Sequence, residues 1–444
     1  MVEHTPPVNP YHPHTDGSAL ALIPFAGRQK AFERLYQQLT DPLKSEVTVL
    51  LGRQGVGKTA LLQHFHPFFD ETFVSTYVPL GHLPLKSEAV WLKALARRIT
   101  GVLIERSFTL ARLPEKTPND SKIRAWFEES YLLEVFNIIR RHRRLVLLLD
   151  DAEHLLRAVE EGQLPPDSFE YLYRLLAGYR QLGMVLTLDA RSESQVSKLS
   201  PLAAVTGVFR LTNLSPEESA WLLREPVHRF YTVSEEAAAA AYRATGGQPR
   251  LLQRFGAALY RQWETQPEQR TFEPEQIKAV FPVVYAESEE EFRQTWLELS
   301  QTERLTLTAI AGRLFDDPLA PINAAEIAAW LVETDYPLDI TAVNAALRSL
   351  EYREILTGSP LQIGAGLVQT WLLENARLDS LVKPAPPDQP PPSPRLDRRM
   401  VALAIFILAV VFLALIFVLA GGNAPVSGGA AAPPTVTLAV TVSP

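Results

Sequence analysis

Apolar positions follow two different periods along the first half of the chain. Uninterrupted apolar runs, typical of strands buried on both faces, lie at 47–52, 73–80, 144–151, 184–191 and 207–214. Between these runs apolar residues return every three or four positions, which predicts helices at 27–39, 59–65, 89–105 and 168–183. The apolar face of the first helix comprises Ala31, Phe32, Leu35, Tyr36 and Leu39, and the last helix is expected to end at Gly183. Strands that alternate with helices predict a parallel α/β sheet covered on both faces.

The pattern becomes helical after Leu214. Ser215, Pro216 and Glu218 have the spacing of a helix N-cap with a capping box. The periodicity that follows predicts a helical subdomain over 214–282. Three short helices and two β-like segments, 354–359 and 361–372, then fill a third unit over 283–380. This order of elements predicts a winged-helix domain.

The two ends of the chain lack these patterns. Residues 1–20 are rich in proline and polar residues, which predicts disorder, and 381–399 form a proline-rich extended linker. Segment 400–420 has no charged residue, and at about 1.5 Å per residue a helix of this length crosses a bilayer. Arginines precede this segment, whereas the tail 421–444 is uncharged. The positive-inside rule therefore predicts a single-pass protein with its larger part in the cytoplasm and its tail outside.

Length, charge and cysteine content narrow the class of protein. A chain of 444 residues predicts two or three domains. The net charge of -7 disfavours nonspecific attraction to nucleic acid or anionic lipid. The absence of cysteine excludes disulfides and thiolate metal sites, and it fits a reducing compartment.

A glycine-rich stretch lies between the first predicted strand and the helix after it. Gly52, Gly57, Lys58 and Thr59 match G-x-x-x-x-G-K-[ST], the phosphate-binding loop when it follows a strand and opens a helix. Glycines let backbone N–H groups turn toward phosphate oxygens, and the helix N-terminus adds partial positive charge. Lys58 is expected to reach the β- and γ-phosphates, and the Thr59 hydroxyl to bind Mg²⁺. The predicted nucleotide contacts are Gly52, Arg53, Gln54, Gly55, Val56, Gly57, Lys58, Thr59 and Ala60.

Two carboxylates end the strand predicted at 144–151. Asp150 is placed to hold the Mg²⁺ shell, because the carboxyl ends of parallel strands line the nucleotide site in such sheets. Asp151 is the predicted catalytic residue that polarises the attacking water, and Glu153 is a second candidate for that role. Lys58 is expected to stabilise the charge that develops on the phosphate. The alternative is that Asp151 or Glu153 caps the following helix.

At these motifs the chain resembles the AAA+/STAND branch of P-loop ATPases. "PFAGRQKAFERL" is similar to the entry box ahead of the phosphate loop, although Gln29, Lys30 and Ala31 replace its usual acidic residues. "TGGQPRLLQRFGAAL" resembles the lid motif of origin-recognition-like members. The resemblance implies an ATPase core over 21–213 with sheet order 5-1-4-3-2 and a lid over 214–282. It also implies that Arg250 senses the γ-phosphate, that Pro249 shapes the adenine pocket, and that Arg191 follows the sensor-1 strand.

The predicted winged-helix domain is too acidic to bind DNA. Residues 287–379 contain 16 acidic residues and 6 basic ones, whereas DNA binding needs a basic face. The sequence therefore predicts a packing or regulatory domain and no nucleic-acid partner.

These features together predict a membrane-anchored cytoplasmic protein that binds ATP or ADP with Mg²⁺. We expect a nucleotide-dependent signalling switch with slow hydrolysis of ATP to ADP and phosphate. We expect it to contact the bilayer through 400–420 and to act on a protein partner that the sequence does not identify. A homo-oligomer is a further expected partner state. The alternatives are an oligomeric AAA+ ATPase that remodels an envelope or secretion complex, a membrane-tethered DNA-binding ATPase, and a nucleotide-binding scaffold without hydrolysis.

Overall fold

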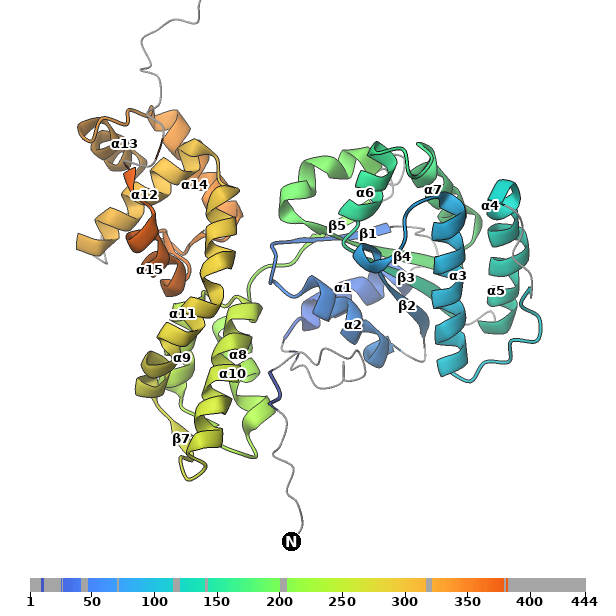
Figure 1. Cartoon of the computed structure of the whole chain (residues 1–444), viewed down its shortest axis with the longest axis horizontal. Coiled ribbons are helices and arrows are strands. Elements are labelled where there is room, and N and C mark those ends of the chain that lie inside the picture. Colours follow the sequence, from blue (N-terminus) through green and yellow to red (C-terminus); the bar gives the residue numbers. More distant parts are fainter. Residues whose placement is uncertain are drawn as a thin grey trace, which may run out of the picture. The chain divides into compact units, whose positions relative to one another are not determined.

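A parallel five-stranded sheet forms the centre of the N-terminal half (Figure 1). The computed structural model describes residues 9–11, 25, 27–40, 47–69, 72–114, 120–139, 143–199, 206–316, 322–378 and 381. The strands are β1 (Val47–Gly52), β2 (Phe73–Pro79), β3 (Arg144–Asp150), β4 (Leu182–Asp189) and β5 (Thr206–Arg210). Their order is β2-β3-β4-β1-β5, and all neighbouring strands pair in parallel. The predicted order 5-1-4-3-2 is confirmed.

Helices cover both faces of the sheet. They are α1 (Gln29–Thr40), α2 (Lys58–Phe69), η2 (Leu80–His82), α3 (Glu88–Glu105), η3 (Asp120–Lys122), α4 (Ile123–Ala125), η4 (Trp126–Leu132), α5 (Leu133–Ile139), α6 (Glu153–Glu160), α7 (Ser168–Gly178) and η5 (Ala190–Leu199). Alternate residues of β3 serve the two faces. Leu145, Leu147 and Leu149 pack with α3 and α5–α7, and Val146 and Leu148 pack with α1 and α2. This alternation follows from the period of two along a strand, and it explains why the strands are apolar throughout.

Two details of the predicted helices are wrong. Tyr36 is 40% exposed, and its ring lies edge-on to Phe73 with centroids 6.0 Å apart at the rim of the apolar face of α1. Gly183 lies inside β4, because α7 already ends at Gly178. The Cβ of any larger residue at position 183 would lie 2.9 Å from Leu39 Cδ2, so the Leu39 side chain would have to shift to admit it.

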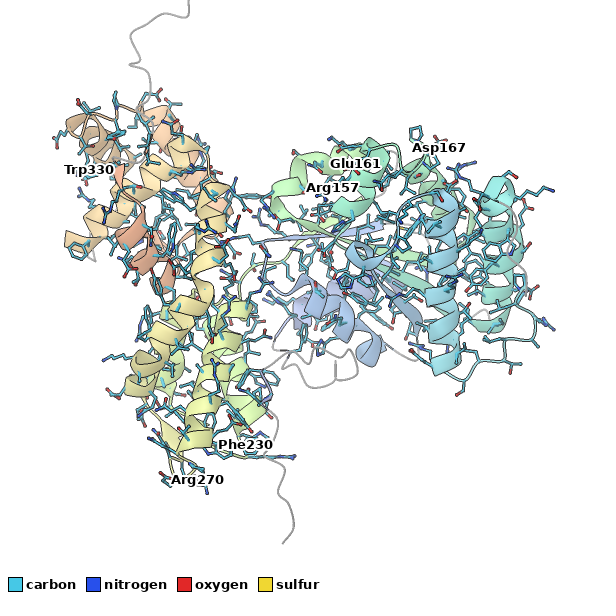
Figure 2. The ribbon with its side chains drawn as sticks, viewed as in Figure 1. Arg157, Glu161, Asp167, Phe230, Arg270 and Trp330 are labelled. Carbon is cyan, nitrogen blue, oxygen red and sulfur yellow. The ribbon has the colours of Figure 1, made fainter. Side chains whose placement is uncertain are left out.

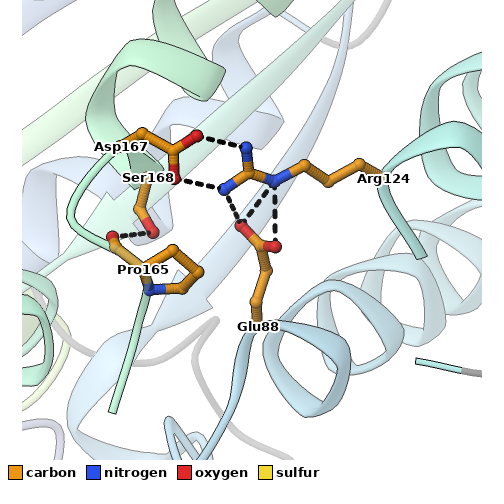
Figure 3. A network of polar contacts seen from close by, with 5 residues as sticks. All are labelled: Glu88, Arg124, Pro165, Asp167 and Ser168. Carbon is orange, nitrogen blue, oxygen red and sulfur yellow. Dashed lines mark hydrogen bonds and ion pairs between the residues drawn. The ribbon is translucent and has the colours of Figure 1, made fainter. Parts of the chain in front are cut away.

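A three-way ion-pair network joins the helices on the outer face (Figure 3). The Arg124 guanidinium donates to both oxygens of Glu88 at 2.6–2.9 Å, and to Asp167 at 2.6 and 2.7 Å. Glu88 begins α3 and Asp167 is the N-cap residue of α7. The bidentate geometry of arginine with a carboxylate fixes the direction of both partners. Arg124 therefore joins the start of α3 to the start of α7.

The lid follows the sheet. It consists of α8 (Pro216–Arg224), η7 (Glu225–Val227), β6 (Thr232–Val233), α9 (Glu235–Thr245), α10 (Pro249–Thr265), β7 (Thr271–Phe272) and α11 (Pro274–Leu297). The capping box predicted at the start of α8 is present, because the Ser215 hydroxyl accepts from the Glu218 N–H at 3.2 Å and the Glu218 carboxylate accepts from the Ser215 N–H at 2.9 Å. Figure 2 shows Phe230 and Arg270 at one end of this subdomain, where Arg270 donates to the Phe230 carbonyl at 3.2 Å.

The N-terminal residues 9–11 contact the lid, although they fall in the segment predicted to be disordered. Tyr11 is 3% exposed, and its hydroxyl donates to the Leu223 carbonyl at 2.9 Å. Gly256 on α10 leaves room for the ring, because a Cβ at position 256 would lie 2.5 Å from it. The prediction of disorder is therefore wrong for these three residues.

The C-terminal part of the described chain is helical with one small hairpin. Its elements are α12 (Gln301–Asp316), α13 (Ala324–Glu333), α14 (Ile340–Tyr352), β8 (Leu356–Thr357), β9 (Gln362–Ile363) and α15 (Gly366–Asn375), with β8 and β9 antiparallel. Helix α11 runs continuously across the boundary predicted at 282/283. The β-like segment predicted at 361–372 is wrong beyond Ile363, because Leu367, Trp371 and Leu372 have helical spacing and are buried on α15.

The remaining predictions concern residues outside the described ranges. They are most of 1–20, the linker over 381–399 apart from residue 381, the apolar segment 400–420 and the tail 421–444. Among the residues that the structure describes, no helix is both long and apolar enough to span a bilayer.

Candidate functional site

The glycine-rich stretch forms a tight loop between β1 and α2. Gly55 and Gly57 have φ angles of +80° and +95°, in the left-handed region that disfavours other residues. The Leu61 N–H donates to the Gly57 carbonyl at 2.9 Å, so α2 begins directly at the end of the loop. The loop therefore has the strand-turn-helix form in which backbone N–H groups and a helix N-terminus face an anion.

Lys58 lies inside this loop. Its side chain donates to the carbonyl oxygens of Gly52 at 2.7 Å and Arg53 at 3.1 Å, and the residue is buried. Burial lowers the pKa of Lys58, while the carboxylates of Asp189 and Glu153 oppose that shift. An ammonium group has three N–H donors. The two carbonyls use two of them, which leaves one for a phosphate oxygen.

The loop opens on a cavity of about 410 Å³. Its lining joins the loop to the lid and to the entry segment before α1: Phe25, Arg28, residues 53–60, Gln63, Asp151, Leu214, Leu222, Pro249, Arg250 and Gln253. The Arg250 N–H donates to the Gly55 carbonyl at 3.3 Å. The structure thus brings together the predicted residues 53–60, Asp151, Pro249 and Arg250, in a volume within the range of small-molecule sites.

Arg28 is a lining residue to which the sequence motif assigned no role. Its backbone is left-handed with φ +64°, and its N–H donates to the Glu218 carboxylate of α8 at 3.1 Å. Its guanidinium donates to the Val56 carbonyl at 2.8 Å, and burial lowers its pKa. Arg28 therefore supports the back of the phosphate loop and ties the entry segment to the lid. The position of Arg28 in the entry box was the only sequence signal for this role. Its partner Val56 lies 28 residues further along the chain, so the contact itself could not be predicted.

Asp150 ends β3 and is 2% exposed. The Thr187 hydroxyl of β4 donates to one carboxylate oxygen at 2.6 Å, and the Tyr77 hydroxyl of β2 donates to the other at 2.9 Å. Burial, followed by the charge of Asp150, raises the pKa of Tyr77, so the phenol stays protonated as a donor. Neither partner was predicted from the sequence, in which a threonine within an otherwise apolar strand was the available signal for Thr187.

Asp151 lines the cavity beside the loop, with a left-handed φ of +57°. Its N–H donates to the Thr187 hydroxyl oxygen at 2.8 Å. Burial and then the charge of Asp150 raise the pKa of Asp151, whereas Lys58 lowers it. The helix-capping alternative is not seen for Asp151, because the N-cap residue of α6 is Ala152.

Four of the predicted site residues lie outside this cavity lining, namely Gly52, Asp150, Glu153 and Arg191. Glu153 accepts a hydrogen bond from the Asp189 N–H. Arg191 donates to Asp189 at 2.7 Å and pairs with Glu298 of the C-terminal part. Burial alone would raise the pKa of Asp189, but the hydrogen bonds from Arg191 lower it overall. The structure therefore places Arg191 in contact with carboxylates, in a second cavity that Arg53 and Gln54 of the loop also line.

The strand order and the loop define this part of the protein as a P-loop NTPase. Residues 24–187 also match the sequence model of the family described as AAA ATPase domain. The chain therefore contains an AAA ATPase domain.

Solved structures agree with this fold. The chain is similar to a Walker-type ATPase of Pyrococcus abyssi, at 15% identity and a TM-score of 0.55, over 79% of this chain and 96% of that chain. Cdc6p from Pyrobaculum aerophilum is 18% identical with a TM-score of 0.42, over 83% of this chain and 98% of that one. The RuvB Holliday junction branch migration motor of Thermotoga maritima is 16% identical with a TM-score of 0.40, over 75% and 90%. TM-scores below 0.5 mean that the last two structures do not by themselves establish a shared fold. No curated protein matches the sequence.

Proposed function

We propose that this protein binds ATP with Mg²⁺ in the cavity beside the phosphate loop, hydrolyses it slowly, and works as a nucleotide-dependent switch. One observation carries the proposal. The loop, the lid residues Pro249 and Arg250, and Asp151 line a single cavity. Groups from the sheet and from the lid thus face the same volume, and a triphosphate there would contact both.

Each polar side chain of the site has a separate role in the proposed chemistry. Lys58 binds the β- and γ-phosphates with its remaining donor, and Arg250 approaches the γ-phosphate from the lid. Thr59 and Asp150 are the residues that would hold Mg²⁺, whose charge offsets that of the phosphates. The fit is supported by the oxygen donors and by the two hydroxyl groups that fix the Asp150 carboxylate at 2.6 and 2.9 Å.

Hydrolysis needs one water in line with the bond that breaks. Asp151 lines the cavity and is exposed to solvent there, so its carboxylate orients that water and accepts a hydrogen bond from it. The new bond from the water oxygen to the γ-phosphorus forms as the bond to ADP breaks, and the proton leaves with phosphate. An aspartate reaches less far than a glutamate, which supports slow turnover and hence a switch that persists in one state.

The C-terminal part supports the switch in a second way. Its order of three helices and an antiparallel hairpin supports a winged helix, and its charge is strongly acidic. Helix α14 would be the recognition helix of a DNA-binding winged helix. Its buried residues are Val343, Ala346, Leu347 and Leu350. We infer a regulatory domain that contacts the ATPase core and a protein partner, with no role in nucleic-acid binding.

The proposal includes anchoring in the cytoplasmic membrane through 400–420, with the ATPase in the cytoplasm. The support is the uncharged length of this segment and the arginines before it. Alkaline carbonate extraction of membranes that contain the full chain tests the anchor. The chain is expected in the pellet, and its release into the supernatant would contradict anchoring.

Calorimetry on the purified full chain tests nucleotide binding. The chain should bind ATP and ADP in the presence of Mg²⁺, and Lys58→Ala should weaken ATP binding about tenfold or more, because a charge-assisted bond to phosphate is lost. Lys93→Ala is the matched control, since Lys93 pairs with Asp120 at 3.0 Å and lies outside the cavity lining. Absence of binding by the native chain would refute the function.

Turnover separates the switch from its alternatives. Asp151→Asn should lower phosphate release about tenfold while ATP still binds, whereas unchanged turnover would favour a scaffold without hydrolysis. Tightly retained ADP with slow release of phosphate supports the switch. Rapid turnover in ATP-dependent rings would instead favour the remodelling ATPase.

A further inference from the structure

Glu291 is a partly buried acid of the lid that no sequence motif singled out. It lies on α11, and its side chain is 13% exposed. One carboxylate oxygen accepts from the Gln248 side-chain amide at 3.0 Å, and the other accepts from Arg254 at 3.0 Å. Arg250 is the third partner, as an ion pair at 3.7 Å. Glu291 thus binds the residue expected to sense the γ-phosphate.

The same residues touch the phosphate loop. The Gln248 amide also donates to the Gln54 carbonyl at 3.3 Å, and the Arg250 N–H donates to the Gly55 carbonyl at 3.3 Å. A Cβ at position 55 would lie 2.7 Å from the Gln248 amide nitrogen, so the lid contacts the loop closely there. By orienting Gln248, Glu291 therefore acts on the loop itself as well as on Arg250.

The two arginines differ in how firmly Glu291 holds them. Arg254 makes a hydrogen bond at 3.0 Å, also donates to the Ser288 hydroxyl at 2.8 Å, and is 24% exposed. Arg250 is 42% exposed, and its 3.7 Å separation is too long for a hydrogen bond. Arg250 can therefore leave Glu291 without breaking a short bond, while Arg254 stays to balance the carboxylate.

We propose that Glu291 sets the preference of the site between ATP and ADP, as a positioning residue that competes with the γ-phosphate for Arg250. This inference rests on the proposed function, because it needs a nucleotide in the cavity. ATP must draw Arg250 away from the carboxylate, and that separation lowers its affinity. ADP has no γ-phosphate and leaves the pair in place. The ratio of ATP affinity to ADP affinity is therefore smaller with the Glu291 carboxylate present than it would be with Arg250 alone.

The test is the ratio of ATP to ADP affinity, measured by calorimetry on the full chain with Mg²⁺. Glu291→Gln keeps the shape and an acceptor for Gln248 but removes the charge. It should tighten ATP binding about fivefold, the size of a partly exposed ion pair, and change ADP binding less than about twofold. Glu287→Gln is the matched control, because Glu287 lies one turn earlier on α11 and pairs with Arg261 at 2.9 Å.

A double-variant cycle isolates the pair. With Arg250→Gln already present, Glu291→Gln should leave the ratio unchanged. Equal weakening of both nucleotides by Glu291→Gln, an unmoved ratio, or an effect that persists without Arg250 would each overturn the inference. These results are distinct from failure of the proposed function, in which the native chain binds neither nucleotide.

Discussion

Three threonines of the central sheet are fully buried but differ in what their hydroxyl groups contact. Thr187 on β4 donates to the Asp150 carboxylate at 2.6 Å and accepts from the Asp151 N–H at 2.8 Å. Thr48 on β1 donates to the neutral Gln38 side chain at 2.9 Å. The Thr76 hydroxyl on β2 has no hydrogen-bond partner among the residues that the structure describes. Replacement of each by valine, which has nearly the same shape, separates the hydrogen bond from the packing.

The expected costs follow from the partners. Thr187→Val leaves a buried charged acceptor and a backbone donor without their partner, which should lower the free energy of unfolding by about 3 kcal/mol. Thr48→Val should cost about 1 kcal/mol, because its acceptor is neutral and Gln38 is partly exposed to water. Thr76→Val should be neutral or stabilising by up to about 1 kcal/mol, because the valine removes a hydroxyl that is buried without a hydrogen bond.

Native-state hydrogen exchange measured by mass spectrometry is the suitable assay. Peptides from β1 to β4 report the opening of the sheet itself, whereas fluorescence would mix in tryptophans of the lid and the C-terminal part. The series should rank Thr187→Val as most destabilising, then Thr48→Val, then Thr76→Val. If Thr76→Val costs as much as Thr187→Val, packing and not the hydrogen bond to Asp150 decides the cost, and the reasoning fails.

Two further predictions concern stability. The Arg124 guanidinium lowers the pKa of Asp167 below its unfolded value, so the stability that Asp167 contributes is full above about pH 4 and is lost as the pH falls below that value through the lowered folded pKa. Arg124→Met should therefore make thermal stability depend less on pH below about 4, and an unchanged slope there would contradict this origin. Gly246 closes α9 with φ +60°, and a Cβ there would lie 2.4 Å from the Gly364 carbonyl oxygen. Gly246→Ala should cost about 2 kcal/mol or more in urea unfolding, and a neutral result would show that the hairpin moves freely.

Contiguous patterns in the sequence were sufficient to predict the strands and the phosphate loop, whereas the strand order came from the resemblance to AAA+ ATPases. Each strand is a short apolar run, and both faces of the sheet need apolar residues, so the runs identified the strands directly. The loop over 52–59 needs only local backbone geometry, which its glycines supply. The capping box at Ser215 likewise depends on residues three positions apart. Such features can be predicted because their partners are neighbours in the chain.

Short apolar segments at element ends were less informative. The stretch 366–375 is apolar enough for a strand, whereas the spacing of Leu367, Trp371 and Leu372 also fits a helix, and the packing of α15 decides between them. Gly183 was expected to end a helix, but it pairs with Val146 of β3 and so belongs to β4. In both cases the sequence allowed two structures of similar local preference, and burial in the fold selected one.

The surroundings of the site were decided by tertiary structure alone. Tyr77 and Thr187 reach Asp150 across 73 and 37 positions of the chain, and Gln248 reaches Glu291 across 43. No periodicity relates these residues, because they meet where parallel strands end side by side and where the lid packs on the loop. The sequence alone therefore identified the residues expected to touch phosphate, whereas only the fold revealed which side chains hold them in place.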